Sequence, residues 1–202
     1  MSERPLRAWA MWLLMGLMVI ALGVSLMMTQ HHELQLYGGE EAGQLWGCAA
    51  DDNVNCDIVN TSEWSELFGV PLFTWAIPTY LLVMGLCAQV IRGQRRWLPV
   101  VAFIGAGASV FSVFLYYISV VEIGYICLWC IRLYGINAAI LVLSFVAGIQ
   151  WDRRPVLVDG LKLGAAFAMV SALSIGVQKG YRAQLLDGTP DIPNLESVAA
   201  TS

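Results

Sequence analysis

Charged residues are scarce in this chain of 202 residues, making up 13% of it, whereas 58% of the residues are hydrophobic. Soluble domains typically contain about 25% charged and about 45–50% apolar residues, so this composition excludes an ordinary soluble domain. The net charge is −4, and no basic stretch interleaved with aromatic residues suggests nucleic-acid binding. We therefore predict an integral membrane protein.

Histidine is rare as well, since His31 and His32 are the only two. The single CxxC motif, Cys127 to Cys130, is not accompanied by a second one or by a Cys/His pair at ligand spacing, so we predict no metal site. Two cysteines at this spacing can close a small disulfide ring, and a helix N-terminus favours a thiolate. The motif favours redox chemistry, with a zinc half-site or two inert buried thiols as the alternatives.

Five segments approach or exceed the roughly 20 apolar residues that a helix needs to cross a membrane. They are 8–28, 71–91, 97–121, 127–149 and 156–177. The first is longer than a typical signal-peptide core and has no small-residue cleavage site after Met28, so we expect it to be retained. The predicted fold class is an all-α integral membrane protein with five transmembrane helices.

Positive charges predict the orientation of the chain. Most of them lie at the N-terminus and in alternate connections: Arg4, Arg7, Arg92, Arg95, Arg96, Arg153, Arg154 and Lys162. The positive-inside rule places these positions in the cytoplasm. We therefore expect a membrane domain over 1–178 in a cell inner membrane or plasma membrane, with a cytoplasmic N-terminus. The 29–70 loop, the 122–126 connection and the tail 179–202 are expected on the extracytoplasmic side.

Two further cysteines, Cys48 and Cys56, enclose a short polar stretch of that outer loop and can form a disulfide. Taken alone, this pair would more often be a structural bridge. A second dithiol on the same membrane face allows thiol–disulfide exchange in series instead. The fifth cysteine, Cys87, is about 24 Å along the second span at 1.5 Å per residue, too deep for exchange, so we expect a small buried hydrophobic residue.

Two further segments carry local signals. Residues 60–68 begin with capping residues and place Trp64, Leu67 and Phe68 on one side, which predicts a short amphipathic helix at the membrane surface. In the third span, the small residues of 105–109 predict a close helix–helix contact.

The order of the motifs resembles that of the vitamin K epoxide reductase family, in particular its bacterial members. The matching features are the pair Cys48 and Cys56, Ser62-Glu63-Trp64, Phe68-Gly69-Val70-Pro71, and Cys127-Leu128-Trp129-Cys130 followed by Tyr134. The resemblance covers roughly residues 8–150. It implies a four-helix bundle around a quinone, ubiquinone or menaquinone, and the fifth span would lie beside that bundle.

The resemblance also implies a role for each cysteine. Cys48 would exchange with a thioredoxin-like partner, Cys56 would relay electrons to Cys127, and Cys130 would face the quinone. Some bacterial members carry a fused thioredoxin-like domain, but about 25 residues follow the fifth span here, so we expect the partner to be a separate extracytoplasmic protein.

Four residues are candidate quinone contacts. Ser62 and Tyr134 stand where the family has hydroxyls beside its pocket, and Phe68 and Tyr117 are aromatic candidates near the outer surface. Tyr134 follows Cys130 by four residues, so both fall on one helical face. Ser62 could equally be a helix cap, and Tyr117 an interfacial aromatic residue. The asparagine that vertebrate members use early in the second span has no counterpart between 70 and 85.

The predicted function is that of a membrane thiol:quinone oxidoreductase that supports disulfide formation. The first alternative is a disulfide-pathway quinone reductase of the unrelated DsbB type, in which the CxxC precedes the spaced pair. The second alternative is a non-catalytic membrane scaffold with structural disulfides.

Overall fold

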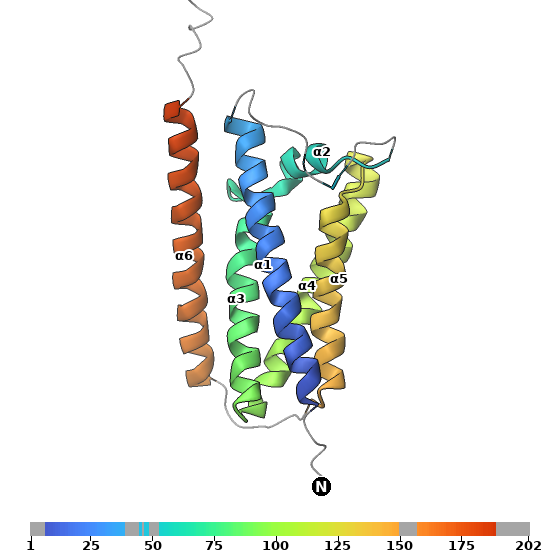
Figure 1. The fold of residues 1–202 in the computed structure, drawn as a ribbon, viewed down its shortest axis with the longest axis vertical. Coiled ribbons are helices and arrows are strands. Elements are labelled where there is room, and N and C mark those ends of the chain that lie inside the picture. The colour runs from blue at the N-terminus through green and yellow to red at the C-terminus, as the bar shows by residue number, and fades with distance from the viewer. Residues whose placement is uncertain (1–6, 39–44, 46, 49–52, 150–156, 189–202) are drawn as a thin grey trace, which may run out of the picture.

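The computed structural model describes residues 7–38, 45, 47–48, 53–149 and 157–188. Its five long helices are α1 (Ala8–Tyr37), α3 (Leu72–Ile91), α4 (Leu98–Ile118), α5 (Leu128–Val146) and α6 (Leu157–Gly188). Each is long and apolar enough to cross a membrane, which confirms the predicted all-α membrane fold (Figure 1). Most of the expected tail, 189–202, lies outside the described residues, as do Arg4, Arg153 and Arg154.

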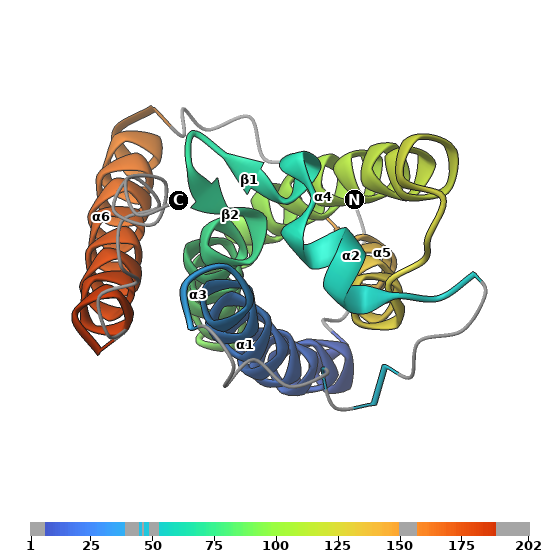
Figure 2. The same cartoon turned by 90° about the horizontal axis from the view of Figure 1, so that it is seen from above.

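Four of these helices form a bundle. α4 packs along α5, and α1 packs against both α3 and α5. α6 lies to one side, against α3 and α1 (Figure 2). The contact between α4 and α5 is close at Gly105, where an added Cβ would lie 2.8 Å from Ile140 Cγ2. This agrees with the packing role predicted for the small residues of 105–109.

The arginines of the η3 turn (Arg95–Trp97) and the cysteine motifs lie at opposite ends of the bundle. The start of α1 and the turn that contains η3 lie at one end, and α2 (Cys56–Thr61) crosses the other end beside the start of α5 (Figure 1). We call this second end the outer end. The arginines of the η3 turn are thus separated from the cysteine motifs by the length of the bundle, as the predicted orientation requires.

α1 extends well past position 28, where we expected the first span to end. Its last turns contain His31, His32 and Glu33, which are buried. The hydropathy pattern underestimated this helix because polar partners from other elements satisfy these side chains. α6 likewise continues past the expected position 177, and its Arg182 donates two hydrogen bonds to Glu33.

The outer loop folds differently from the amphipathic helix that we expected over 60–68. α2 begins earlier, because the Asn55 side chain caps it by accepting hydrogen bonds from the Asp57 and Ile58 N–H groups. It ends at Ser62, whose backbone is extended. A short 3₁₀ turn, η2 (Glu63–Ser65), and an antiparallel pair, β1 (Glu66–Leu67) with β2 (Val70–Pro71), then lead into α3.

Candidate active site

Both predicted cysteine pairs are disulfides. The Cα atoms of Cys48 and Cys56 are 6.0 Å apart, and those of Cys127 and Cys130 are 5.2 Å apart. All four cysteines are at least nine-tenths buried. Within the described residues Cys87 is a free thiol, and it is buried in α3 as expected.

The helix that follows the CxxC begins directly at the motif. Cys127 is the N-cap of α5 and has extended backbone, and its Sγ accepts a hydrogen bond of 3.1 Å from the Cys130 N–H. The free N–H groups at a helix start and the helix dipole stabilise negative charge. After reduction, the thiolate of Cys127 is therefore favoured at this position.

A backbone bridge joins the outer loop to the CxxC. Val54 and Ile126 form a parallel bridge, in which the Ile126 carbonyl accepts from the Asn55 N–H at 3.1 Å. The Ile126 N–H donates to the Asn53 carbonyl at 2.9 Å. Cys56 follows Val54 by two residues, and Cys127 follows Ile126 directly. The two disulfides are therefore held next to each other at the outer end.

The two histidines attach α2 to the end of α1. His31 Nε2 lies 2.7 Å from a carboxylate oxygen of Asp57, the residue after Cys56. His32 Nδ1 lies 2.5 Å from the Asn60 carbonyl oxygen, and its Nε2 lies 3.0 Å from a carboxylate oxygen of Glu66. The segment that carries Cys56 is thus held by the two histidines of α1 and by the backbone bridge to Ile126.

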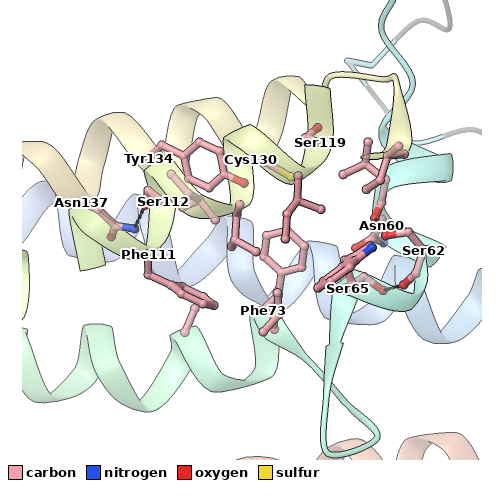
Figure 3. Close-up of a pocket in the computed structure, with 18 of the residues that line it drawn as sticks. Asn60, Ser62, Ser65, Phe73, Phe111, Ser112, Ser119, Cys130, Tyr134 and Asn137 are labelled. Atoms are coloured by element: carbon pink, nitrogen blue, oxygen red, sulfur yellow. Dashed lines mark hydrogen bonds between the residues drawn. The ribbon is translucent and has the colours of Figure 1, made fainter. Parts of the chain in front are cut away.

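A cavity lies beside Cys130, lined by residues of α2, η2, α3, α4, α5 and the short π-helix η4 (Ser119–Ile123) (Figure 3). Its walls are mostly apolar, with Phe73 and Phe111 among them. Its polar lining residues form two groups on different elements. The outer group is Asn60, Ser62, Ser65 and Ser119, and the inner group is Tyr80, Ser112, Tyr134 and Asn137. A flat apolar ligand with a polar atom at each end fits this lining.

The inner group is partly tied into a hydrogen-bond chain. The Tyr80 hydroxyl donates to Asn137 Oδ1 at 3.0 Å, and Asn137 Nδ2 donates to Ser112 Oγ at 2.9 Å. The Ser112 hydroxyl then donates to the Ala108 carbonyl at 2.8 Å. By contrast, no described residue forms a hydrogen bond with the Tyr134 hydroxyl. Tyr134 is therefore the group whose O–H is available to a ligand.

Two of the four expected quinone contacts line the cavity. Tyr134 and Ser62 both do, but the Ser62 hydroxyl already donates to the Val59 carbonyl at 2.9 Å. Phe68 does not; it is 89% exposed at the turn between β1 and β2, with a left-handed φ of 57°. Tyr117 is 58% exposed on α4 and does not line the cavity either. The sequence could not show which way these two aromatic side chains face.

Six of the eight polar lining residues were not among the predicted contacts, and Asn60, Tyr80 and Asn137 are three of them. Asn137 follows Cys130 by seven residues, two helical turns along one face, so its spacing could have identified it. From the sequence, Asn60 was recognisable only as a possible helix cap. Tyr80 belongs to an apolar span, and only the packing of α3 against α5 brings it to Asn137.

A second groove adjoins the cavity between α3 and α4. The two share five lining residues: Leu72, Ala76, Tyr80, Phe111 and Asn137. Beyond them the groove is lined by Leu67, Trp75, Thr79, Ile104, Gly107 and Ala108. An apolar path therefore leads from the cavity toward the outside of the bundle.

Comparison with known proteins agrees with this geometry. The family model described as the vitamin K epoxide reductase family matches residues 10–145, which include both cysteine pairs and all the residues that line the cavity, but not α6. None of the curated protein sequences compared with the chain matches it. The chain therefore belongs to the vitamin K epoxide reductase family of membrane oxidoreductases, which use thiols to reduce quinones or their epoxides.

Proposed function

We propose that this protein is a membrane thiol:quinone oxidoreductase that oxidises a separate, extracytoplasmic thioredoxin-like protein and reduces ubiquinone or menaquinone. One arrangement carries the proposal. The bridge at Val54 and Ile126 holds the outer disulfide beside the inner one, and Cys130 of the inner disulfide borders the cavity. Electrons can then pass from the loop to the cavity by exchange between neighbouring cysteines.

The proposed sequence begins at the outer pair. A thiolate of the reduced partner attacks Cys48, and resolution of the mixed disulfide leaves an oxidised partner and two thiols at Cys48 and Cys56. Cys56 then attacks Cys127. Re-formation of the Cys48–Cys56 disulfide releases Cys127 and Cys130 as a dithiol. That dithiol returns to a disulfide by giving two electrons and two protons to the quinone, which leaves as the quinol.

We place the quinone ring between the two polar groups of the cavity. The Tyr134 hydroxyl, free among the described residues, donates to a ring carbonyl, and this contact strengthens as the oxygen gains negative charge. The apolar groove between α3 and α4 receives the isoprenoid tail. The protein's contribution is to position the ring near Cys130 and to exclude water from it.

Turnover with purified protein tests the proposal. Detergent-solubilised protein is mixed with a reduced thioredoxin-like protein and a short-tailed quinone, and the absorbance of the quinone is followed. We expect loss of the quinone and oxidation of the protein dithiol in equal amounts, and no reaction with Cys130→Ala. If the wild-type protein leaves both substrates unchanged, it is a scaffold with structural disulfides, and the proposed function is wrong.

Membership of the family also bears on the DsbB-type alternative. In that group the CxxC precedes the spaced pair, whereas Cys48 and Cys56 precede Cys127 and Cys130 here. The order of the motifs and the matching family model both favour the vitamin K epoxide reductase relationship.

A further inference from the structure

Asn60 occupies a particular place in the cavity wall. It lies on α2, one helical turn after Cys56, and is 1% exposed. Figure 3 shows it beside Ser62 and Ser65, away from the group that contains Tyr134. Its backbone carbonyl accepts a hydrogen bond from His32, so its position is fixed from α1.

The side-chain amide of Asn60 has one end satisfied and one end free. Its Nδ2 donates to the Met28 carbonyl oxygen at 3.4 Å. Its Oδ1 is buried and has no hydrogen-bond partner among the described residues. Turning the amide over would place Oδ1 against the Met28 carbonyl oxygen, and two acceptors do not pair. The contact with Met28 therefore fixes the free end as an acceptor.

A buried acceptor without a partner is unusual and destabilising, so a ligand of this cavity gains by supplying a hydrogen. A quinone offers only carbonyl oxygens, which are acceptors themselves. A quinol offers hydroxyl hydrogens. We propose that Asn60 Oδ1 accepts a hydrogen bond from a hydroxyl of the quinol, so that the site binds the reduced ligand more tightly than the oxidised one.

This inference rests on the proposed function and adds to it which redox form of the ligand the site prefers. Tyr134 supplies a donor, which suits a quinone carbonyl, whereas Asn60 supplies an acceptor, which suits only the hydrogen-bearing product. The contact with Asn60 forms as the ring takes up protons. It therefore favours reduction of the bound quinone and slows release of the quinol.

Inhibition by the product separates the two ligand forms. The variant is Asn60→Leu in the full chain, and the matched control is Thr61→Val, which removes a neighbouring α2 hydroxyl that does not line the cavity. The measured quantities are the KM of a short-tailed quinone and the inhibition constant of the same compound added as quinol. We expect the quinol inhibition constant to rise about tenfold and the quinone KM to change less than about twofold, as for the loss of one hydrogen bond. Thr61→Val should change neither.

Other outcomes overturn the inference. An equal rise in both constants assigns Asn60 a packing role, and a rise in the quinone KM alone shows that the amide donates instead. No change shows that water, not the ligand, meets Oδ1. If Asn60→Leu does not fold, Asn60→Ala is measured in the same way and judged by the same outcomes. A wild-type protein that reduces no quinone contradicts the proposed function rather than this inference.

Discussion

The outer end of the bundle and its opposite half are held together by different forces. In the opposite half, α1 buries Met11, Leu14 and Met18 completely, and α4 approaches α5 closely at Gly105. At the outer end, buried polar side chains such as His32 and Glu33 bind partners far away in the sequence. One half is close-packed and apolar, and the other depends on individual polar contacts.

This difference fits the proposed function of the outer end. The segments that carry the two cysteine pairs meet at the bridge between Val54 and Ile126, in irregular backbone that helix packing alone does not hold. Charged and hydrogen-bonding pairs fix them instead, from α1 on one side and α6 on the other. Arg182 of α6 contributes to these polar contacts. It binds Glu33, lies 3.8 Å from Glu66, and belongs to the helix outside the matched family region.

The largest expected effect comes from removing one outer cysteine. With Cys56→Ala, oxidation of the thioredoxin-like protein should fall to the rate without enzyme, because the relay into Cys127 is lost. Dithiothreitol, a small dithiol, should still drive quinone reduction through Cys127 and Cys130. Measuring both reductants with the same quinone checks this. Undiminished oxidation of the protein dithiol would show that it reaches the inner pair directly.

The next effect concerns the buried charge pair at the outer end. Arg182→Leu leaves the carboxylate of Glu33, whose side chain is 0% exposed, without its cation. We expect the free energy of unfolding to fall by about 3 kcal/mol, because breaking a buried ion pair strands one charge. Thermal unfolding in detergent measures it. The neutral pair Glu33→Gln with Arg182→Gln should recover more than half of the loss.

A matched variant on the same helix completes this prediction. Lys179 is exposed on α6, so Lys179→Leu should leave the unfolding temperature nearly unchanged. Equal effects of Arg182→Leu and Lys179→Leu would mean that the pair with Glu33 contributes nothing to the outer end.

Close packing gives a smaller effect. In Gly105→Ala the new methyl group would lie 2.8 Å from both Ile140 Cγ2 and the Leu141 nitrogen, so α4 and α5 must separate. We expect a loss of about 1–2 kcal/mol after the helical preference for alanine offsets part of the strain. Gly135→Ala on α5 meets no atom within 4 Å and should be neutral or stabilising. Equal destabilisation by both variants would show that the close contact at Gly105 does not contribute specifically to the stability of this half.

The smallest effect is expected at the remaining cysteine. Cys87 is fully buried in α3 as a free thiol, so Cys87→Ala should leave quinone reduction within a few-fold of wild type. Its unfolding free energy should fall by about 1 kcal/mol for the lost packing. The same turnover assay measures activity, and a loss as large as that of Cys130→Ala would place Cys87 in the electron path.

The sequence predicted the apolar half better than the outer end, for physical reasons. Membrane helices are long apolar runs, so their existence follows from local composition, and the start of α5 follows from the CxxC itself. The ends of α1 and α6 were placed too early. Their polar turns are held by contacts between distant residues, such as that of Glu33 with Arg182 at a separation of 149 residues. No local pattern contains that information.

The candidate site shows the same limit. The four cysteines were identified from spacing, and Tyr134 from its place one turn after Cys130. Phe68 and Tyr117 were selected as aromatic residues near the surface, but which way such side chains face depends on tertiary packing. The position of Asn60 in the cavity wall depends on the contacts of His32 and Asn55 with α2, which the sequence does not show.

The central claim is that electrons pass from Cys56 to Cys127, and a trapped intermediate tests it most directly. In Cys130→Ala the CxxC disulfide cannot form, so the Cys127 thiolate attacks Cys56 of the outer disulfide and releases Cys48 as a thiol. Because Cys130 is not there to re-form the CxxC disulfide and release Cys56, an internal Cys56–Cys127 disulfide should accumulate and quinone reduction should stop. Non-reducing proteolysis with mass spectrometry should find the two cysteine peptides joined, and replacing Cys56 or Cys127 should abolish the link. The bridge at Val54 and Ile126 holds the two segments side by side. Absence of the link while the variant still oxidises the partner protein would contradict the proposed path.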